Sequence, residues 1–175
     1  MTAFAFTIRH ELPDDSTAID QLHAVSFGPG RFARAAFRVR EGFGHDGATS
    51  FVALHEGEII GSVRLTPIEI GGVDAMLLGP LAVVPKYKGC GAGRALMRRS
   101  MDAVAQSGGE FVLLVGDRPY YGPFGFESVA GGSIRFPAPV DPSRVLLADL
   151  RAKQVRASEA PALPSGAVVA KPTAA

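Results

Sequence analysis

Several features that would narrow the function of a protein are scarce in this chain of 175 residues. Cys90 is the single cysteine, which excludes a disulfide within the chain. The formal net charge is only +1, so bulk electrostatics do not indicate a nucleic-acid partner. No apolar run approaches the roughly 18–20 residues of a membrane helix, and the N-terminus lacks the regions of a secretory signal. We therefore expect a cytoplasmic protein that binds neither membrane nor nucleic acid.

The overall composition is that of a globular protein, with 47% hydrophobic and 20% charged residues. At this length we expect one domain with a sizeable core, spanning residues 1–152. From about Arg156 the chain is rich in Ala and Pro and has little to bury, which predicts a disordered tail over residues 153–175. The four histidines show no metal-ligand spacing, so we expect no metal site.

Hydrophobic patterning predicts an α/β fold. Two apolar segments, Phe51–Leu54 and Ile59–Leu65, flank a tight-turn signal and predict a hairpin. Asp74–Val84 predicts a long strand, and an amphipathic helix over residues 91–106 leads to the short buried strand Phe111–Val115. We expect a mixed, largely antiparallel sheet with helices on its faces.

The most informative segment is the turn Lys88-Gly89-Cys90-Gly91-Ala92-Gly93, which joins the long strand to the helix. Its alternate glycines let backbone N–H groups gather around a ligand without interference from β-carbons. The helix N-terminus adds the positive end of a dipole. Basic side chains surround the turn: Lys86, Lys88, Arg94, Arg98 and Arg99. The sequence therefore predicts a site for a phosphate or pyrophosphate.

Two known chemistries use such a turn. Dinucleotide-binding proteins have G-x-G-x-x-G and an acidic residue about 20 positions later. Here the glycines alternate as G-x-G-x-G and Asp117 is a loose substitute, so a dinucleotide-binding oxidoreductase is the weakest interpretation. The turn instead resembles the [Q/R]-x-x-G-x-[G/A] motif of the GNAT superfamily of acyl-CoA-dependent N-acyltransferases, with lysine at the first position.

A second motif extends the resemblance. Tyr120–Phe126 looks like the later Y-x-x-x-G-F signature of that family, and after Leu113–Asp117 it resembles the YhbS-like bacterial branch. The resemblance covers about Phe4 to Leu150. It implies a GNAT-type sheet, mostly antiparallel, with a splayed parallel strand pair and helices on both faces. Gly79-Pro80 independently favours a bulge in the long strand, because proline cannot donate to a sheet ladder.

The resemblance also implies acetyl-CoA as the acyl-donor cosubstrate. Backbone groups of Leu81 and Val83, with Ala82 between them, would pair with the amides of the pantetheine arm. The pyrophosphate would be held by the turn and the start of the helix: Lys88, Gly89, Cys90, Gly91, Ala92, Gly93 and Arg94.

Catalytic residues are less sharply indicated. Tyr121 aligns with the tyrosine that protonates the departing CoA thiolate in many relatives. The strand before the turn holds no carboxylate, so the general base stays open. Glu69 and Asp117 rank first, while Glu41, Asp46 and a chain of water molecules remain alternatives.

Together these features predict an N-acetyltransferase that works by direct transfer to an amine acceptor in a ternary complex. No histidine lies near Cys90 in the sequence, so we expect no acyl-enzyme. The alternative is a non-catalytic CoA-binding or sensor module of the same fold.

A basic run marks the region that shapes the acceptor pocket in the family: Arg31, Arg34, Arg38 and Arg40. It is either a solvated helix face or a site for an anionic acceptor with a carboxylate or phosphate. The acceptor itself is not identified. Family members often pair through their sheets, which allows a homodimer.

Overall fold

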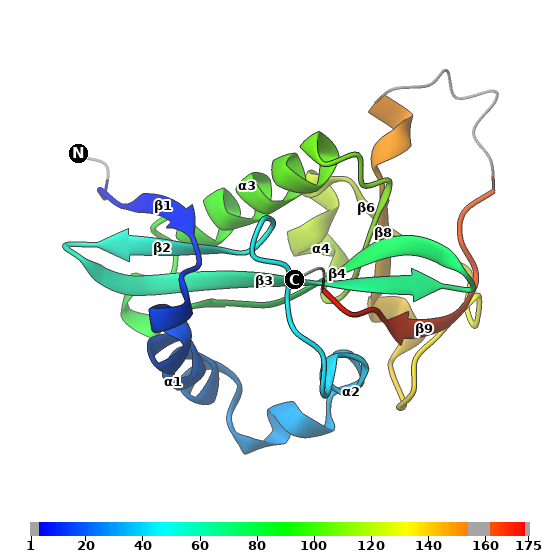
Figure 1. Ribbon diagram of the computed structural model, residues 1–175, viewed down its shortest axis with the longest axis horizontal. Coiled ribbons are helices and arrows are strands. Elements are labelled where there is room, and N and C mark those ends of the chain that lie inside the picture. Colours follow the sequence, from blue (N-terminus) through cyan, green and yellow to red (C-terminus); the bar gives the residue numbers. More distant parts are fainter. Residues whose placement is uncertain (1–3, 154–161, 174–175) are drawn as a thin grey trace.

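The computed structural model describes residues 4–153 and 162–173 (Figure 1). Its helices are α1 (Ser16–Phe27), α2 (Ala35–Arg40), α3 (Ala92–Gln106) and α4 (Arg118–Tyr121). Its strands are β1 (Thr7–His10), β2 (Phe51–His55), β3 (Glu58–Ile70), β4 (Val73–Val83), β5 (Phe111–Val115), β6 (Phe126–Ser128), β7 (Ile134–Arg135), β8 (Val145–Asp149) and β9 (Gly166–Ala170). Short 3₁₀ turns lie at Pro13–Asp15, Pro29–Ala33, Pro85–Tyr87, Gly122–Phe124, Pro142–Arg144 and Leu150–Lys153. Within the described residues no helix is long and apolar enough to cross a membrane.

One mixed sheet organises the chain. Its main path runs β1-β2-β3-β4-β5-β8-β6, and β9 pairs with β3 and β7 beside that path. The β4–β5 and β7–β9 pairs are parallel and the other pairs are antiparallel. The expected mixed, mostly antiparallel sheet is therefore confirmed.

The predicted hairpin between β2 and β3 forms where the turn signal lies. His55 pairs with Glu58, so only Glu56 and Gly57 connect the strands. Both have positive φ, 50° and 85° respectively, as a two-residue turn matched to the twist of the strands requires. This register places Arg64 at the middle of β3, next to the part of β4 that carries the predicted bulge.

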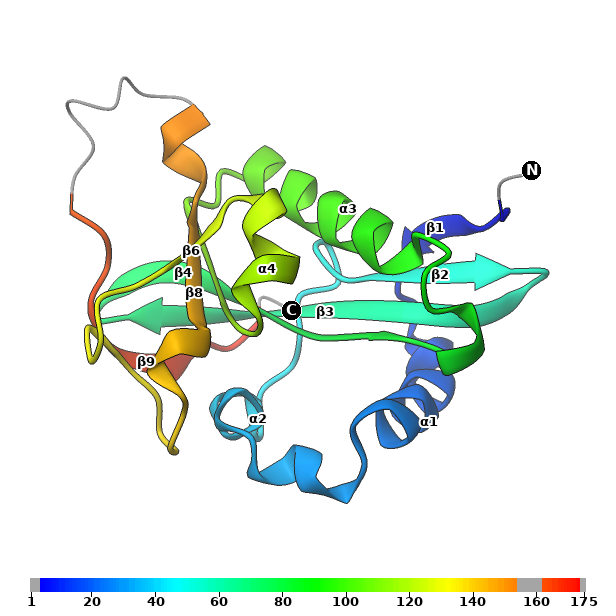
Figure 2. The ribbon, with the colours of Figure 1, turned by 180° about the vertical axis from the view of Figure 1, so that it is seen from behind.

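Helices cover both faces of the sheet, as Figures 1 and 2 show from opposite sides. On one face α3 buries Leu96, Met97 and Val104 against apolar side chains of β2, β3 and β5. On the other face lie α1 and α2, and Val39 of α2 packs in a second cluster with Ile68 and other residues of β3, β4, β5 and β9. The two layers put α3 and the α1–α2 segment on opposite sides of β4.

Strand β9 corrects the predicted disordered tail. Residues 166–170 pair with Ile68–Ile70 of β3 and with β7, and Val168 is buried in the second cluster. The prediction failed because Ala and Pro dominate the surrounding composition, whereas a five-residue strand needs only two inward side chains to attach to an existing sheet. The part of the proposed tail between 154 and 161 lies outside the described residues.

Candidate active site

A bulge in β4 opens the centre of the sheet. Leu81 pairs with Val63 and Leu78 with Leu65, so Gly79 and Pro80 together face one residue, Arg64. This is the predicted bulge, and Gly79 adopts a φ of 129° that a side chain would disfavour.

The parallel strands β4 and β5 separate at the same place. They pair only at Met76–Val112 and Leu77–Leu113, and beyond these residues no further pairs join them. We call the space between residues 78–83 of β4 and residues 114–116 of β5 the wedge. The resemblance led us to expect such a splayed pair.

Backbone polarity along the wedge follows from strand alternation. The Val84 N–H donates to the Ile60 carbonyl at 2.8 Å, and Ala82 is opposite Ser62, so both turn their backbone groups toward β3. The backbone groups of Leu81 and Val83 consequently face the wedge. Of the three residues predicted on this strand, Leu81 and Val83 can therefore pair with a ligand, while the Ala82 backbone belongs to the β3–β4 ladder.

At the outer end of β4 the Gly-rich turn presents backbone N–H groups at the start of α3. Gly89 and Gly91 have φ values of 88° and 94°, and Gly91 caps the helix without a side-chain partner. The Lys88 and Cys90 N–H groups are used inside the turn, donating to Pro85 and Tyr87. Among the described residues no acceptor is bound to the N–H groups of the first helical turn: Ala92, Gly93 and Arg94. These donors and the helix dipole favour an anion.

Tyr120 links this turn to the wedge. A β-carbon at Gly93 would lie 3.0 Å from the Tyr120 hydroxyl and 3.5 Å from Val83 Cγ2, so glycine permits a close approach of α3, α4 and β4. Burial raises the pKa of Tyr120, although the nearby Arg94 charge opposes this. Tyr120 thus belongs with the turn rather than with the far side of the wedge.

Tyr121 lies on the β5 side of the wedge. Its ring covers Gly116, where a β-carbon would come within 2.3 Å of Cε2. Burial raises the pKa of Tyr121 to about 12, so the phenol keeps its proton at neutral pH. No group of the described residues forms a hydrogen bond with its hydroxyl, which leaves the hydroxyl free to bind a ligand.

A cavity of about 800 Å³ joins the wedge to the α1–α2 side of the sheet. Residues 78–81 of β4 and 114–117 at the end of β5 line it, together with Tyr121 and side chains of α1 and α2. The structure thus brings together Leu81, Tyr121 and Asp117 from the predicted set. Asp117 is 73% exposed, and its carboxylate accepts a hydrogen bond from Arg144 at 3.1 Å.

The other predicted carboxylates are not at this cavity. Glu69 lies near the β3–β4 hairpin, opposite Asp74, and Lys171 after β9 is 3.6 Å from its carboxylate. Glu41 pairs with Arg38, and Asp46 accepts a hydrogen bond from the Thr49 hydroxyl. Glu69 was ranked high because its strand precedes β4 in the sequence, but the long β3–β4 hairpin carries it to the far end of the sheet.

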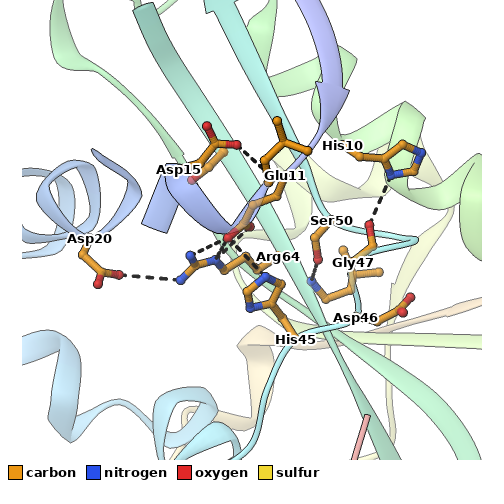
Figure 3. Close-up of polar contacts among 12 residues, drawn as sticks. His10, Glu11, Asp15, Asp20, His45, Asp46, Gly47, Ser50 and Arg64 are labelled. Carbon is orange, nitrogen blue, oxygen red and sulfur yellow. Dashed lines mark hydrogen bonds and ion pairs between the residues drawn. The ribbon is translucent and has the colours of Figure 1, made fainter. Parts of the chain in front are cut away.

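The cavity wall contains an ionic cluster that sequence reasoning missed (Figure 3). Arg64 Nη2 donates to Glu11 Oε1 at 2.6 Å, His45 Nε2 lies 3.2 Å from the same oxygen, and Asp20 Oδ1 lies 3.6 Å from Arg64 Nη1. Burial by itself would raise the pKa of Glu11, but hydrogen bonds from His45 and Arg64 outweigh it and lower the pKa to about 2. These residues come from four separate segments, so no local sequence motif predicts the cluster.

Two further groups, one buried and one half-buried, face the same cavity. His23 of α1 lies 3.2 Å from the Ser62 hydroxyl, and burial, helped by the Arg64 charge, lowers its pKa to about 4. Arg40, the last residue of α2, donates from Nη1 to the Gly79 carbonyl at 2.7 Å. Burial and then the Arg64 charge lower the pKa of Arg40 to about 10, so it remains a cation at neutral pH.

Comparisons with known proteins agree with this geometry. Residues 16–126 match the model of the acetyltransferase (GNAT) family. The chain is 36% identical over 133 residues to the uncharacterized N-acetyltransferase YhbS of Escherichia coli K12, covering 73% of this chain and 77% of that protein. It is 32% identical over 143 residues to YjhQ of the same strain, another uncharacterized N-acetyltransferase, covering 79% and 78%. A crystal structure of Escherichia coli YhbS in complex with CoA superimposes with a TM-score of 0.76 at 30% identity, covering 98% of this chain and 92% of that one.

Proposed function

The chain belongs to the acetyltransferase (GNAT) family, and we propose that this acetyltransferase passes the acetyl group of acetyl-CoA directly to an amine within one ternary complex. The observation that carries the proposal is the wedge beside the Gly-rich turn. An extended thioester arm needs a gap in a sheet with free backbone groups, and its diphosphate needs clustered N–H donors. Both features occur along one continuous segment, residues 79–94.

The donor would be held mainly by the backbone. Leu81 and Val83 would pair with the pantetheine amides as a neighbouring strand would. The N–H groups at the start of α3 would bind the pyrophosphate, with Lys88 and Arg94 supplying charge. The complex of YhbS with CoA supports this assignment, because that protein shares the fold and 30% of aligned residues.

Tyr121 would act on the sulfur. As the amine attacks the thioester carbonyl, the C–S bond breaks and negative charge develops on sulfur. A phenol that stays protonated at neutral pH and has a free hydroxyl can donate a hydrogen bond there. A backbone N–H on the wedge side of β4 would polarise the carbonyl in the same way.

The amine must lose a proton for the transfer to proceed. Of the two carboxylates ranked first, only Asp117 lines the cavity, so we assign proton acceptance to Asp117, directly or through water. Its position at the start of α4, where its carbonyl accepts the Tyr121 N–H at 3.1 Å, puts it close to the proposed acid. Asp117→Asn should lower kcat/KM with little change in acetyl-CoA affinity.

A two-stage assay tests the proposal. Acetyl-CoA at about 100 times its Kd should stabilise the protein by about 2.7 kcal/mol in a thermal-shift titration. Release of free CoA thiol across a panel of amines then measures transfer. Stabilisation without acceptor-dependent thiol release would indicate the non-catalytic CoA-binding module, and absence of both would refute the proposal.

The Tyr121 role has a matched control next to it. Tyr121→Phe should lower kcat roughly 100-fold while leaving acetyl-CoA affinity nearly unchanged. Tyr120→Phe should weaken acetyl-CoA affinity by a smaller factor and leave kcat nearly unchanged, because the Tyr120 hydroxyl approaches Gly93 of the phosphate-binding turn. Equal kinetic constants for Tyr121→Phe and wild type would remove Tyr121 from the mechanism.

A further inference from the structure

Arg40 occupies an unusual position at the bulge. It ends α2 and lines the cavity with its guanidinium half-buried, donating one hydrogen bond, to the Gly79 carbonyl. A guanidinium has five N–H donors. Among the described residues no carboxylate lies within 4 Å of Arg40, and Gly79 is its one hydrogen-bond partner.

The other arginines of the cavity are placed differently. Arg64 is neutralised by Glu11 and Asp20, and Arg144 pairs with Asp117. Arg31 and Arg34 also line the cavity and have no carboxylate partner in the described chain, and they lie over the rings of Phe32 and Phe27 respectively. The α2 side of the cavity therefore carries uncompensated positive charge.

An unpaired guanidinium inside a cavity is costly for the folded protein. Burial removes water from the charge, and the Arg64 cation adds repulsion. A bound carboxylate would offset both effects, because the planar fork of arginine matches two carboxylate oxygens. The donors of Arg40 that Gly79 does not use are available for this.

The bulge sets the distance between a carboxylate bound to Arg40 and the thioester carbonyl that the amine attacks. Arg40 binds Gly79, and Leu81, two residues on, turns its backbone into the wedge where the thioester carbonyl would lie. An acceptor held by Arg40 would therefore present its amine only a few bonds from its anionic group.

We propose that the acceptor is a small aminocarboxylic acid whose carboxylate binds Arg40 while its amine attacks the thioester, an inference that rests on the proposed function. An amine that carries no carboxylate, or one separated from its carboxylate by a long chain, fits this arrangement poorly. In Arg40→Gln the charge is lost, whereas Arg40→Lys keeps it without the fork.

The experiment compares acids with their amides. Glycine, alanine, phenylalanine and β-alanine are each assayed beside the corresponding amide by CoA thiol release, with 6-aminohexanoate as the long-chain control. Wild type should prefer the short acids over their amides by roughly 10- to 100-fold in kcat/KM, the usual effect of a charge-assisted pair. Arg40→Gln should abolish that preference while changing the amides less than about threefold, and Arg40→Lys should keep part of it.

Arg38→Gln is the matched control, because Arg38 lies on the same helix but is exposed and pairs with Glu41 outside the cavity. The ratio of kcat/KM for acids to kcat/KM for their amides should be the same in Arg38→Gln as in wild type. Thermal melts of each variant verify folding, and Arg40→Lys carries the test if Arg40→Gln does not fold.

Each remaining result decides against the proposal. Equal use of acids and amides by wild type would overturn it. An equal loss for acids and amides in Arg40→Gln would mean that Arg40 supports the bulge or polarises the thioester. If acetyl-CoA binds but no short acid gives thiol release or further stabilises the CoA-bound protein, the carboxylate assignment is wrong. Failure of acetyl-CoA to bind at all would instead refute the proposed function.

Discussion

The two halves of the candidate active site are built in different ways. The half proposed to bind the donor is a continuous stretch, residues 79–94, and offers mostly backbone groups: the wedge side of β4 and the N–H groups at Gly91 and after it. The half proposed to bind the acceptor draws side chains from α1, α2, β3 and several loops, among them Asp20, Arg40 and Arg64. Recognition by backbone groups suits a ligand that stays the same, because substitutions change backbone groups little. Side chains from separate segments can each be substituted independently, which suits a ligand that varies.

The largest expected effect tests whether the donor half depends on backbone conformation. Gly91→Val places a β-branched residue at a φ of 94°, so the turn must leave the conformation that gathers its N–H groups. We expect acetyl-CoA affinity to fall roughly 30- to 100-fold by calorimetry, equivalent to about 2–3 kcal/mol.

Gly108→Val is the matched control for that variant. Gly108 follows the other end of α3, has a φ of 81° and likewise has no atom within 4 Å of an added β-carbon. It should destabilise the fold to a similar degree and leave acetyl-CoA affinity unchanged. Equal affinity losses in both variants would mean that α3 responds as a whole and that the turn has no special role.

The second prediction tests the acceptor half through pH. The pKa of His23 is about 4 in the folded protein against 6.5 for an ordinary histidine, so the unfolded chain binds a proton that the folded chain does not. The free energy of unfolding is therefore highest above pH 6.5 and should fall by about 3 kcal/mol as the pH drops to 4. The Glu11 carboxylate adds a loss in the same direction only below its usual range near 4.5, toward pH 2.

His23→Gln should flatten the interval from pH 6.5 to 4 in urea titrations, because glutamine can keep a hydrogen bond to Ser62 without titrating. His55→Gln, on β2 and outside the cavity, serves as the control and should retain the wild-type slope. A slope that survives His23→Gln would assign the acid sensitivity to another group.

The smallest expected effect concerns the support of α2. Val168 of β9 is 6% exposed and shares the second apolar cluster with Val39 of α2, whereas its neighbour Val169 is 56% exposed. Val168→Ala should lower the free energy of unfolding by about 1 kcal/mol and Val169→Ala by much less. Donor affinity should not change in either variant. Indistinguishable urea midpoints would show that β9 contributes little to the acceptor half.

Local patterns were enough to predict much of the donor half. The hairpin, the bulge at Gly79-Pro80, the apolar face of α3 and the Gly-rich turn all depend on residues near one another in the chain. Glycines and prolines constrain their own backbone, so their consequences appear in the sequence itself. The same reasoning misjudged residues 166–170, because strand addition depends on a distant edge rather than on local composition.

What the sequence determined by itself is therefore the family fold and the backbone conformation of the site proposed for the donor, because a few adjacent residues fix those conformations. Only the tertiary structure decided the acceptor half. It moved Glu69 away from the cavity, assembled Glu11, His45 and Arg64 from separate segments, and brought Arg40 against the bulge. The contacts of Arg64 with Glu11 and of Arg40 with Gly79 join residues 53 and 39 positions apart, and such pairings are set by how the layers pack, which no short stretch of sequence encodes.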